Sequence, residues 1–281
     1  MQKPDFALPS PRAVQAQLLK ILEKADQASL ASALRLLAKY RSHVLQYELA
    51  TSRPAEVQAG PFRGMKYVDH SAEGCHLPKL LGCYEHELQP LFEAAIRSGY
   101  DHVVNVGCAE GYYAVGLALR LPQAVVHAYD INPGAREMCA KIAARNGVAD
   151  RVRVGELFSS AAFGEFAGKR TLFVIDIEGN EAGLFAKASD EALAGGDFIV
   201  ECHDAAPGKI SAPLLERLRR THAARLVGHD LPQFDLPAFL ERRDHLDQLL
   251  SIWEWRGHPT PWLVAASRQR PPSAFFAAVG G

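Results

Sequence analysis

Residues 102 to 112 read His-Val-Val-Asn-Val-Gly-Cys-Ala-Glu-Gly-Tyr, and this stretch decides the fold of the chain. It begins with a short run rich in valine, which is typical of a buried parallel strand. The run ends in a turn between Gly107 and Gly111, and residues 110 to 120 then show helical spacing. Because glycine has no Cβ, such a turn lets a ligand approach the backbone at the carboxyl end of the strand.

The rest of the chain continues this alternation of short apolar runs and helical patterns. Further runs that predict strands are Val125–Tyr129, Val152–Val154, Leu172–Ile175, Phe198–Val200, Arg225–Gly228 and Trp262–Ala266. Helical spacing occurs near residues 134–145, 181–193, 214–221 and 236–250. The alternation predicts an α/β protein with a doubly wound, mostly parallel, seven-stranded Rossmann-like sheet.

Four regions follow from the pattern along the chain. Residues 1–58 predict an N-terminal helical region that starts at Ser10-Pro11 and breaks near residues 26–29. This region is either a cap on the main domain, a dimerisation arm or an active-site lid. Residues 59–100 predict a linker with a turn and a short strand over 60–70 and a helix over 83–97, which together could form a lid. Residues 101–270 form the Rossmann-like domain, and we expect residues 271–281 to fray.

The amino-acid composition of the chain excludes some classes of function. The 281 residues include 31 Lys and Arg and 32 Asp and Glu, so the formal net charge is -1. This balance excludes a protein that holds nucleic acid by bulk charge. The five cysteines form no regular framework, which favours a reducing compartment. Because the sequence has no apolar run long enough to span a membrane and no signal-like segment, we expect a cytoplasmic protein with no membrane partner.

The glycine turn indicates which ligand the sheet edge binds. A dinucleotide fingerprint needs G-x-G-x-x-G, but counting from Gly107 places Ala109 and Tyr112 at the second and third glycine positions. This spacing argues against an NAD-linked oxidoreductase, which remains the less favoured alternative enzyme. Asp130 ends the second predicted strand, and its carboxylate can accept hydrogen bonds from both hydroxyls of a ribose.

The glycine turn and Asp130 together resemble the class I S-adenosylmethionine-dependent methyltransferases over about residues 102–204. The resemblance implies that S-adenosylmethionine is the cofactor, with Asp130 on its ribose, and that Ile131 and Asn132 flank its adenine. Glu156 and Leu157, after the third strand, would contact the adenine ring. The turn residues that would line its methionine and ribose are Asn105, Gly107, Cys108, Ala109, Glu110, Gly111 and Tyr112. The family often has an acid in place of Asn105 and a glycine in place of Ala109, which leaves a non-catalytic binding protein as an alternative.

The fourth and fifth predicted strands end in acidic motifs. Residues 176–181 read Asp-Ile-Glu-Gly-Asn-Glu, and residues 201–204 read Glu-Cys-His-Asp. This pair looks like the FkbM-type methyltransferases, a resemblance that implies O-methylation of a small molecule or a sugar. The segment from Leu80 to Leu88 is similar to the one that closes over the cofactor in such enzymes. The Asn/Asp-Pro-Pro-aromatic turn of amino-methylating relatives is absent after the fourth strand.

Methyl transfer from a sulfonium is an in-line displacement, so the protein supplies alignment and a proton acceptor. His203 is the expected base because it ends the fifth strand at the ligand-binding edge. Asp176 is expected to orient the acceptor or contact the cofactor, and Glu178 either takes part in catalysis or stabilises its loop.

Two further features concern metals and partners. Asp176, Glu201, His203 and Asp204 would place oxygen and imidazole ligands on adjacent strand ends. Their pattern does not closely match the magnesium site of catechol-type O-methyltransferases, so a divalent metal is not favoured and no metal ligands are assigned. Three tryptophans, Trp253, Trp255 and Trp262, either form an apolar wall for the acceptor or pack the last strands. The N-terminal helices could support a homodimer.

Overall fold

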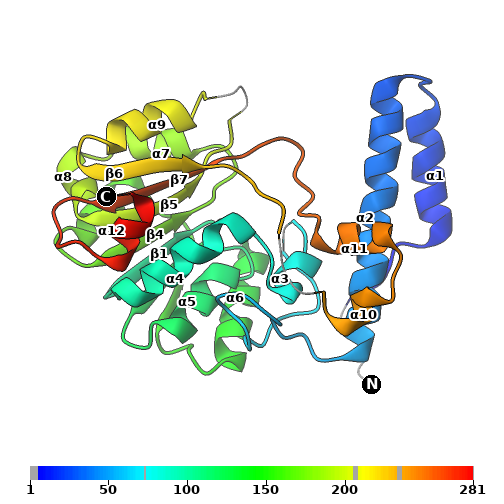
Figure 1. Cartoon of the computed structure of the whole chain (residues 1–281), viewed down its shortest axis with the longest axis horizontal. Coiled ribbons are helices and arrows are strands. Elements are labelled where there is room, and N and C mark those ends of the chain that lie inside the picture. The colour runs from blue at the N-terminus through cyan, green and yellow to red at the C-terminus, as the bar shows by residue number, and fades with distance from the viewer. Residues whose placement is uncertain (1–5, 73, 205–207, 233–235, 281) are drawn as a thin grey trace.

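A computed structural model describes residues 6–72, 74–204, 208–232 and 236–280. Its centre is a seven-stranded sheet in the order β3-β2-β1-β4-β5-β7-β6 (Figure 1). The strands are β1 (His102–Val106), β2 (Val125–Tyr129), β3 (Val152–Gly155), β4 (Thr171–Ile175), β5 (Gly196–Glu201), β6 (His222–Val227) and β7 (Trp262–Ser267). Strands β1 to β5 pair in parallel, whereas β7 pairs antiparallel with both β5 and β6. The predicted fold class is therefore confirmed, and the seven predicted strands are all present.

Helices cover both faces of the sheet (Figure 1). One face carries α4 (Gln89–Ser98), α5 (Tyr112–Arg120), α6 (Pro133–Arg145) and α12 (Ala274–Val279). The other carries η2 (Ser160–Phe166), α7 (Glu181–Ala186), α8 (Asp190–Ala194) and α9 (Ser211–Leu218). Val103 and Val174 pack in the first apolar layer, and their neighbours Val104 and Phe173 pack in the second. Burial on both faces explains why these strands are continuous apolar runs in the sequence.

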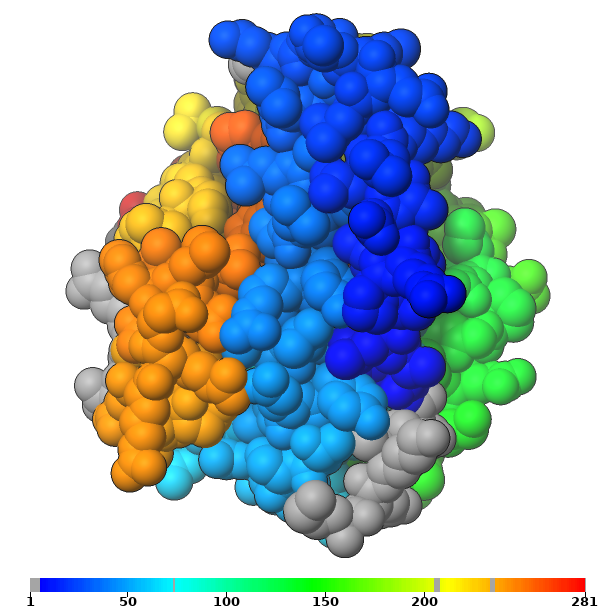
Figure 2. All heavy atoms as spheres, turned by 90° about the vertical axis from the view of Figure 1, so that its right-hand side faces the viewer, coloured from blue at the N-terminus to red at the C-terminus, as the bar shows by residue number. Residues whose placement is uncertain are grey.

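The N-terminal region forms two helices, as predicted. α1 (Pro11–Leu22) begins at the Ser10 cap, and α2 (Gln27–Ser52) begins at Asp26 and ends before Pro54. Figure 2 shows α1, α2 and the orange segment of α10 (Ala238–Glu241) and α11 (His245–Ile252) side by side on one face of the molecule. Arg41 of α2 joins Asp247 of α11 through an ion pair of 2.6 Å. This ion pair attaches α2 to α11, and the choice between a cap, a dimerisation arm and a lid stays a prediction.

The region before β1 differs from its prediction. The expected strand over residues 60–70 is only an isolated bridge between Glu56 and Lys66. The expected helix over 83–97 begins later than predicted, because α3 (Leu77–Leu81) is followed by a turn and then by the 3-10 helix η1 (His86–Leu88), which leads into α4. A turn therefore lies where the periodicity predicted the start of one continuous helix.

The C-terminal tail also differs from its prediction. Fraying of residues 271–281 is wrong for the described part, because residues 274–279 form α12 on α4. Phe275 and Val279 are buried in the apolar layer, and this burial stabilises a short helix that the proline-containing sequence did not suggest. None of the helices in the described ranges is long and apolar enough to cross a membrane.

Candidate active site

A cavity of about 320 Å³ lies at the carboxyl ends of β1, β2 and β4, and we name it pocket A. Its lining contains Val106, Gly107, Tyr129, Asp130, Ile131, Glu156, Leu157, Phe158, Asp176, Ile177, Glu178, Asn180 and Leu184. Six of the residues expected to contact a cofactor meet there, namely Gly107, Asp130, Ile131, Glu156, Leu157 and Asp176. They come together because the carboxyl ends of parallel strands lie at one edge of the sheet.

The rim of pocket A exposes two large apolar side chains. Ile131 is 75% exposed and Leu157 is 71% exposed, although both line the cavity. A single exposed leucine is ordinary on a protein surface. Two such side chains on one cavity offer an apolar surface to a flat aromatic group, which suits the adenine expected there.

The glycine turn is shaped by the protein's own backbone. Gly107 has φ +75°, and a Cβ built on it would lie 1.6 Å from the carbonyl oxygen of Asp176. Gly111 has φ +97°, and its Cβ would lie 2.7 Å from Cys139 Sγ in α6. The sequence analysis attributed these glycines to ligand approach, but the turn after β4 and the packing of α6 already require them.

Asp130 holds the glycine turn in place. Its Oδ2 accepts a hydrogen bond of 2.8 Å from the backbone N–H of Ala109, a non-glycine residue with φ 45°. Its Oδ1 accepts one of 2.8 Å from the backbone N–H of Asn132. Because a carboxylate offers about four acceptor positions, both oxygens retain capacity for ribose hydroxyls.

Glu110 differs most from its expected role. Its side chain is fully buried behind the turn, where it forms a 2.7 Å ion pair with Lys79 and accepts hydrogen bonds from Tyr67 and the backbone of Ala72. Burial alone would raise the pKa of Glu110, but Lys79 and Tyr67 outweigh it and lower this pKa to about 2. The Glu110 carboxylate therefore fastens the turn to the segment before β1 and does not line pocket A.

Several other motif residues also have roles within the fold. The Nδ2 of Asn105 donates to the carbonyl oxygen of Val174, and Asn132 caps α6 by accepting from the backbone of Gly134. Cys108 and Tyr112 are buried in the apolar layer. The side chains of these residues are not part of the lining of pocket A, so their expected contacts with a cofactor remain untested predictions.

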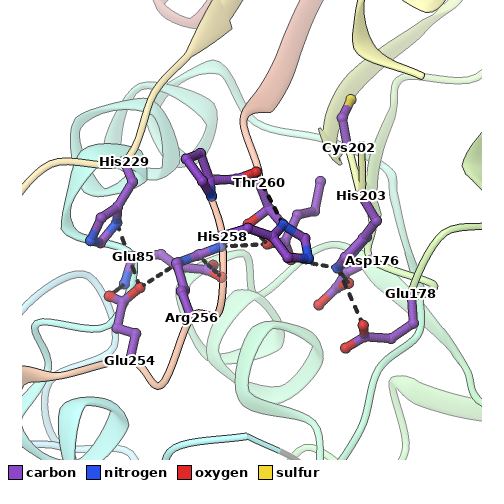
Figure 3. A network of polar contacts seen from close by, with 12 residues as sticks. Glu85, Asp176, Glu178, Cys202, His203, His229, Glu254, Arg256, His258 and Thr260 are labelled. Carbon is purple, nitrogen blue, oxygen red and sulfur yellow. Dashed lines mark hydrogen bonds and ion pairs between the residues drawn. The ribbon is translucent and has the colours of Figure 1, made fainter. Parts of the chain in front are cut away.

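A second cavity, of about 370 Å³, adjoins the first and is named pocket B (Figure 3). Its lining contains Lys39, Gly74, Tyr84, Asp176, Glu178, Glu201, His203, Glu254, Trp255, Arg256, Gly257, His258 and Thr260. Asp176 and Glu178 line both cavities, so the end of β4 forms their common wall. Lys39 comes from α2, which shows that the N-terminal cap contributes to this pocket.

His203 stands at the centre of a group of carboxylates (Figure 3). Its Nδ1 is 2.8 Å from Oε1 of the fully buried Glu181. Its Nε2 lies 3.4 Å from Glu178, 3.7 Å from Asp176 and 3.9 Å from Glu201. Burial alone would lower the pKa of His203, but the hydrogen bond to Glu181 and the charges of Glu201 and Asp176 raise it to about 9. The imidazole is therefore protonated at neutral pH.

Arg256 is the main site residue that the sequence analysis missed. Its guanidinium forms ion pairs of 2.5 Å with Glu201, 2.9 Å with Glu254 and 3.0 Å with Glu85. Burial and the neighbouring Glu201 raise the pKa of Glu85 and also that of Asp176 well above their ordinary values. Carboxylates thus outnumber cations along this wall, and Arg256 is needed to balance them.

Non-glycine residues with left-handed backbone are concentrated around the two pockets among the described residues. Among the described residues, the non-glycine residues with positive φ are Glu85 (46°), Ala109 (45°), Glu178 (55°) and Trp255 (65°). Glu178 and Trp255 line pocket B, Glu85 binds its Arg256, and Ala109 forms the turn beside pocket A. Such strain is typical of functional sites. Of the expected tryptophan wall only Trp255 lines pocket B, whereas Trp262 is fully buried in the core.

No protein-family model matches the chain, and no curated protein matches its sequence. Among solved structures, the chain is similar to a cofactor-bound protein from MTB, with 17% identity, a TM-score of 0.45 and coverage of 93% of this chain and 99% of that one. It is also similar to a SAM-dependent O-methyltransferase from Thermotoga maritima, with 14% identity, a TM-score of 0.45 and coverage of 66% of each chain. For a precorrin-6y C5,15-methyltransferase from Geobacter metallireducens the identity is 12%, the TM-score 0.43 and the coverage 64% and 87%. Because these sequence identities and TM-scores are low, the similarity carries no argument about function, and the fold class rests on the strand order of the sheet.

Proposed function

We propose that the protein is an S-adenosylmethionine-dependent methyltransferase of FkbM type that methylates a hydroxyl of a small molecule or a sugar. The observation that carries this proposal is the common wall of Asp176 and Glu178 between two cavities of different character. Pocket A has an apolar rim and contains Asp130, which would bind the ribose, and pocket B has carboxylates and an imidazole. A methyl donor in pocket A and a hydroxyl acceptor in pocket B would meet at this wall.

The residues of pocket A fit S-adenosylmethionine. Ile131 and Leu157 would lie against the adenine, and the free acceptor positions of Asp130 would receive the ribose hydroxyls. Gly107 and Asp176 border the end of the pocket nearest to pocket B. When bound, the cofactor supplies a sulfonium methyl group, and the protein aligns the two partners.

The residues of pocket B would hold the acceptor and take up its proton. Asp176 and Glu178 can accept hydrogen bonds from a hydroxyl at the common wall, and His203 is the proposed base. Because its pKa of about 9 keeps His203 protonated at neutral pH, it can take up a hydroxyl proton only after losing its own. The transfer rate should then rise with pH up to about 9.

Calorimetry with S-adenosylmethionine tests the proposal directly. The wild type should bind with micromolar affinity, about -8 kcal/mol. Asp130→Ala should weaken binding by at least about 30-fold, because it removes both the ribose acceptor and the support of the turn. Glu137→Ala, which removes an exposed acid from the neighbouring α6, is the matched control and should leave the affinity unchanged.

The alternatives give different results. A thermal shift with NAD or NADP but none with S-adenosylmethionine would indicate the oxidoreductase and contradict the proposal. Binding of S-adenosylmethionine without turnover on a panel of hydroxylated acceptors, together with unchanged binding in His203→Ala, would indicate a non-catalytic binding protein. An unchanged affinity in Asp130→Ala would contradict the assignment of pocket A.

A further inference from the structure

We propose that Asp176, Glu178 and His203, supported by Glu201, form a binding site for one divalent transition-metal ion, with Mn²⁺ as the best-fitting ion. One potential ligand atom from each of Asp176, Glu178 and His203 lies within 4.8 Å of the others. The sequence did not favour a metal, because its pattern does not closely match the magnesium site of catechol-type O-methyltransferases. The site is argued from the arrangement of these side chains alone, and it replaces one part of the proposed function, because a metal-bound His203 would not be the base.

The spacing of the donor atoms is the first argument. His203 Nε2 lies 3.4 Å from Glu178 Oε2, 3.7 Å from Asp176 Oδ1 and 3.9 Å from Glu201 Oε2, and all three contacts are ion pairs without hydrogen-bond geometry. Around a cation with bonds of about 2.2 Å, ligand atoms at right angles are about 3.1 Å apart and opposite atoms about 4.4 Å apart. The observed separations fall between these two limits.

The orientation of the imidazole is the second argument. Glu181 is fully buried, and its Oε1 lies 2.8 Å from His203 Nδ1, so the ring presents Nε2 to the carboxylates. A carboxylate on the far nitrogen is the usual way in which proteins orient a metal-binding histidine. Asp176 Oδ1 lies 3.7 Å from His203 Nε2, and this oxygen is buried and has no hydrogen-bond partner among the described residues.

Charge balance is the third argument. The carboxylates that form ion pairs with His203 or Arg256 are those of Glu85, Asp176, Glu178, Glu181, Glu201 and Glu254. His203 would be neutral as a metal ligand, so Arg256, which is already bound to three of these six carboxylates, would be the remaining cation of the group. Buried carboxylates at this density are stabilised by an added cation.

The ligand types favour Mn²⁺ over Mg²⁺. Carboxylate oxygens suit magnesium and manganese, whereas an imidazole nitrogen suits transition metals. Mn²⁺ shares the preference of Mg²⁺ for carboxylate oxygens and, as a transition-metal ion, also accepts an imidazole nitrogen. Glu178 is 73% exposed in its side chain, so the coordination sphere stays open towards pocket B. With the cation in place His203 is a ligand rather than the base, and the pKa of a hydroxyl beside the cation falls.

The test is a Mn²⁺ titration of the full chain after EDTA treatment and gel filtration, without S-adenosylmethionine, followed by the electron paramagnetic resonance signal of free Mn²⁺. One ion should bind per chain, and Mg²⁺ should displace it only at an at least tenfold higher concentration. Asp176→Asn and His203→Gln should weaken binding at least about 30-fold, and Glu178→Gln about 5-fold. Glu156→Gln, which removes another acid at the same sheet edge, should leave Mn²⁺ affinity unchanged.

The substitutions of Asp176 and His203 could prevent folding, because these side chains are more buried than that of Glu178. Glu178→Gln removes one ligand from an exposed side chain without disturbing the core, so it still tests the metal site. Equal Mn²⁺ binding in the wild type and in Glu178→Gln, or no binding in the wild type, would overturn the metal site. Calorimetry with S-adenosylmethionine on the EDTA-treated protein separates the two proposals. Cofactor binding without Mn²⁺ binding would reject only the metal, and Mn²⁺ binding without cofactor binding would reject only the proposed function.

Discussion

Pockets A and B share a wall but depend on different forces. Pocket A is shaped by close backbone packing, in which Gly107 lets β1 approach the turn after β4. Pocket B is held by buried charges, with Arg256 between Glu85, Glu201 and Glu254. We therefore expect a larger side chain in the glycine turn to disrupt pocket A, and removal of a buried charge to disrupt pocket B.

The largest effect is expected when a methyl group is added to the turn of pocket A. In Gly107→Ala the new Cβ would overlap the carbonyl oxygen of Asp176, and backbone cannot rotate away as a side chain can. We expect a loss of about 4 kcal/mol or more in the free energy of unfolding, measured by urea denaturation.

Gly168→Ala is the matched control for this substitution. Gly168 has φ +74°, nearly the value of Gly107, but its Cβ would meet no atom within 4 Å. It should cost only the strain of positive φ, about 1 kcal/mol. Equal losses in the two variants would show that the contact with Asp176 is unimportant.

Removing the cation of pocket B should have the next largest effect. Arg256→Met leaves Glu85, Glu201 and Glu254 without their common partner, which should cost about 3 to 4 kcal/mol at pH 7.5. The pKa values of Glu85 and Glu254 are already raised in the folded state, first by burial, and would rise further in the variant. The penalty should therefore shrink as the pH falls towards the unfolded-state pKa of about 4.5.

The control for Arg256→Met is Arg243→Met. Arg243 also pairs with a glutamate, Glu48, but the two side chains are 34% and 40% exposed. Its loss should cost less than about 1 kcal/mol at any pH. A similar small cost for Arg256→Met would mean that the carboxylates of pocket B are protonated and do not need the arginine.

The two pockets also differ in how far the sequence predicts them. Asp130, Leu157 and Asp176 each lie just after a strand, so a parallel sheet places them at one edge without further information. The same rule predicted His203 and its nearness to Asp176. It could not predict that Glu110 points behind the turn, because its partner Lys79 lies in the short helix α3, which the sequence pattern did not indicate.

Pocket B was largely hidden from sequence analysis for a physical reason. Lys39, Glu85 and Arg256 reach it from α2, from a left-handed turn and from a loop before β7, which are brought together only by tertiary packing. No local pattern distinguishes Arg256 from a surface arginine. The signal that was available is the run Trp253-Glu254-Trp255-Arg256, in which charges alternate with tryptophans, but only the aromatic residues were interpreted.

A third prediction concerns the buried ion pair of Lys79 and Glu110 behind pocket A. Glu110 has a folded-state pKa of about 2, below its ordinary 4.5, because Lys79 and Tyr67 outweigh the effect of burial. Its contribution to stability, about 3 kcal/mol, is present above pH 4.5 and is lost as the pH falls towards 2. The measurement compares the pH dependence of unfolding in the wild type and in the neutral double variant Lys79→Met, Glu110→Gln. If the free energy of unfolding changes with pH in the same way in both proteins, the ion pair does not make the expected contribution to stability.

The smallest effect on stability is expected at the rim of pocket A. Leu157 is 71% exposed, so Leu157→Ala should change the free energy of unfolding by less than about 0.5 kcal/mol. Calorimetry should nevertheless show a roughly 5- to 10-fold loss of S-adenosylmethionine affinity, because the adenine loses an apolar surface.

Leu34 of α2 is also 71% exposed, and Leu34→Ala should change neither quantity. A loss of stability in Leu34→Ala that depends on protein concentration would instead indicate a homodimer through the N-terminal helices. Unchanged cofactor affinity in Leu157→Ala would show that the rim of pocket A does not bind adenine, and the contrast between a packed turn and an open, ligand-binding rim would then fail.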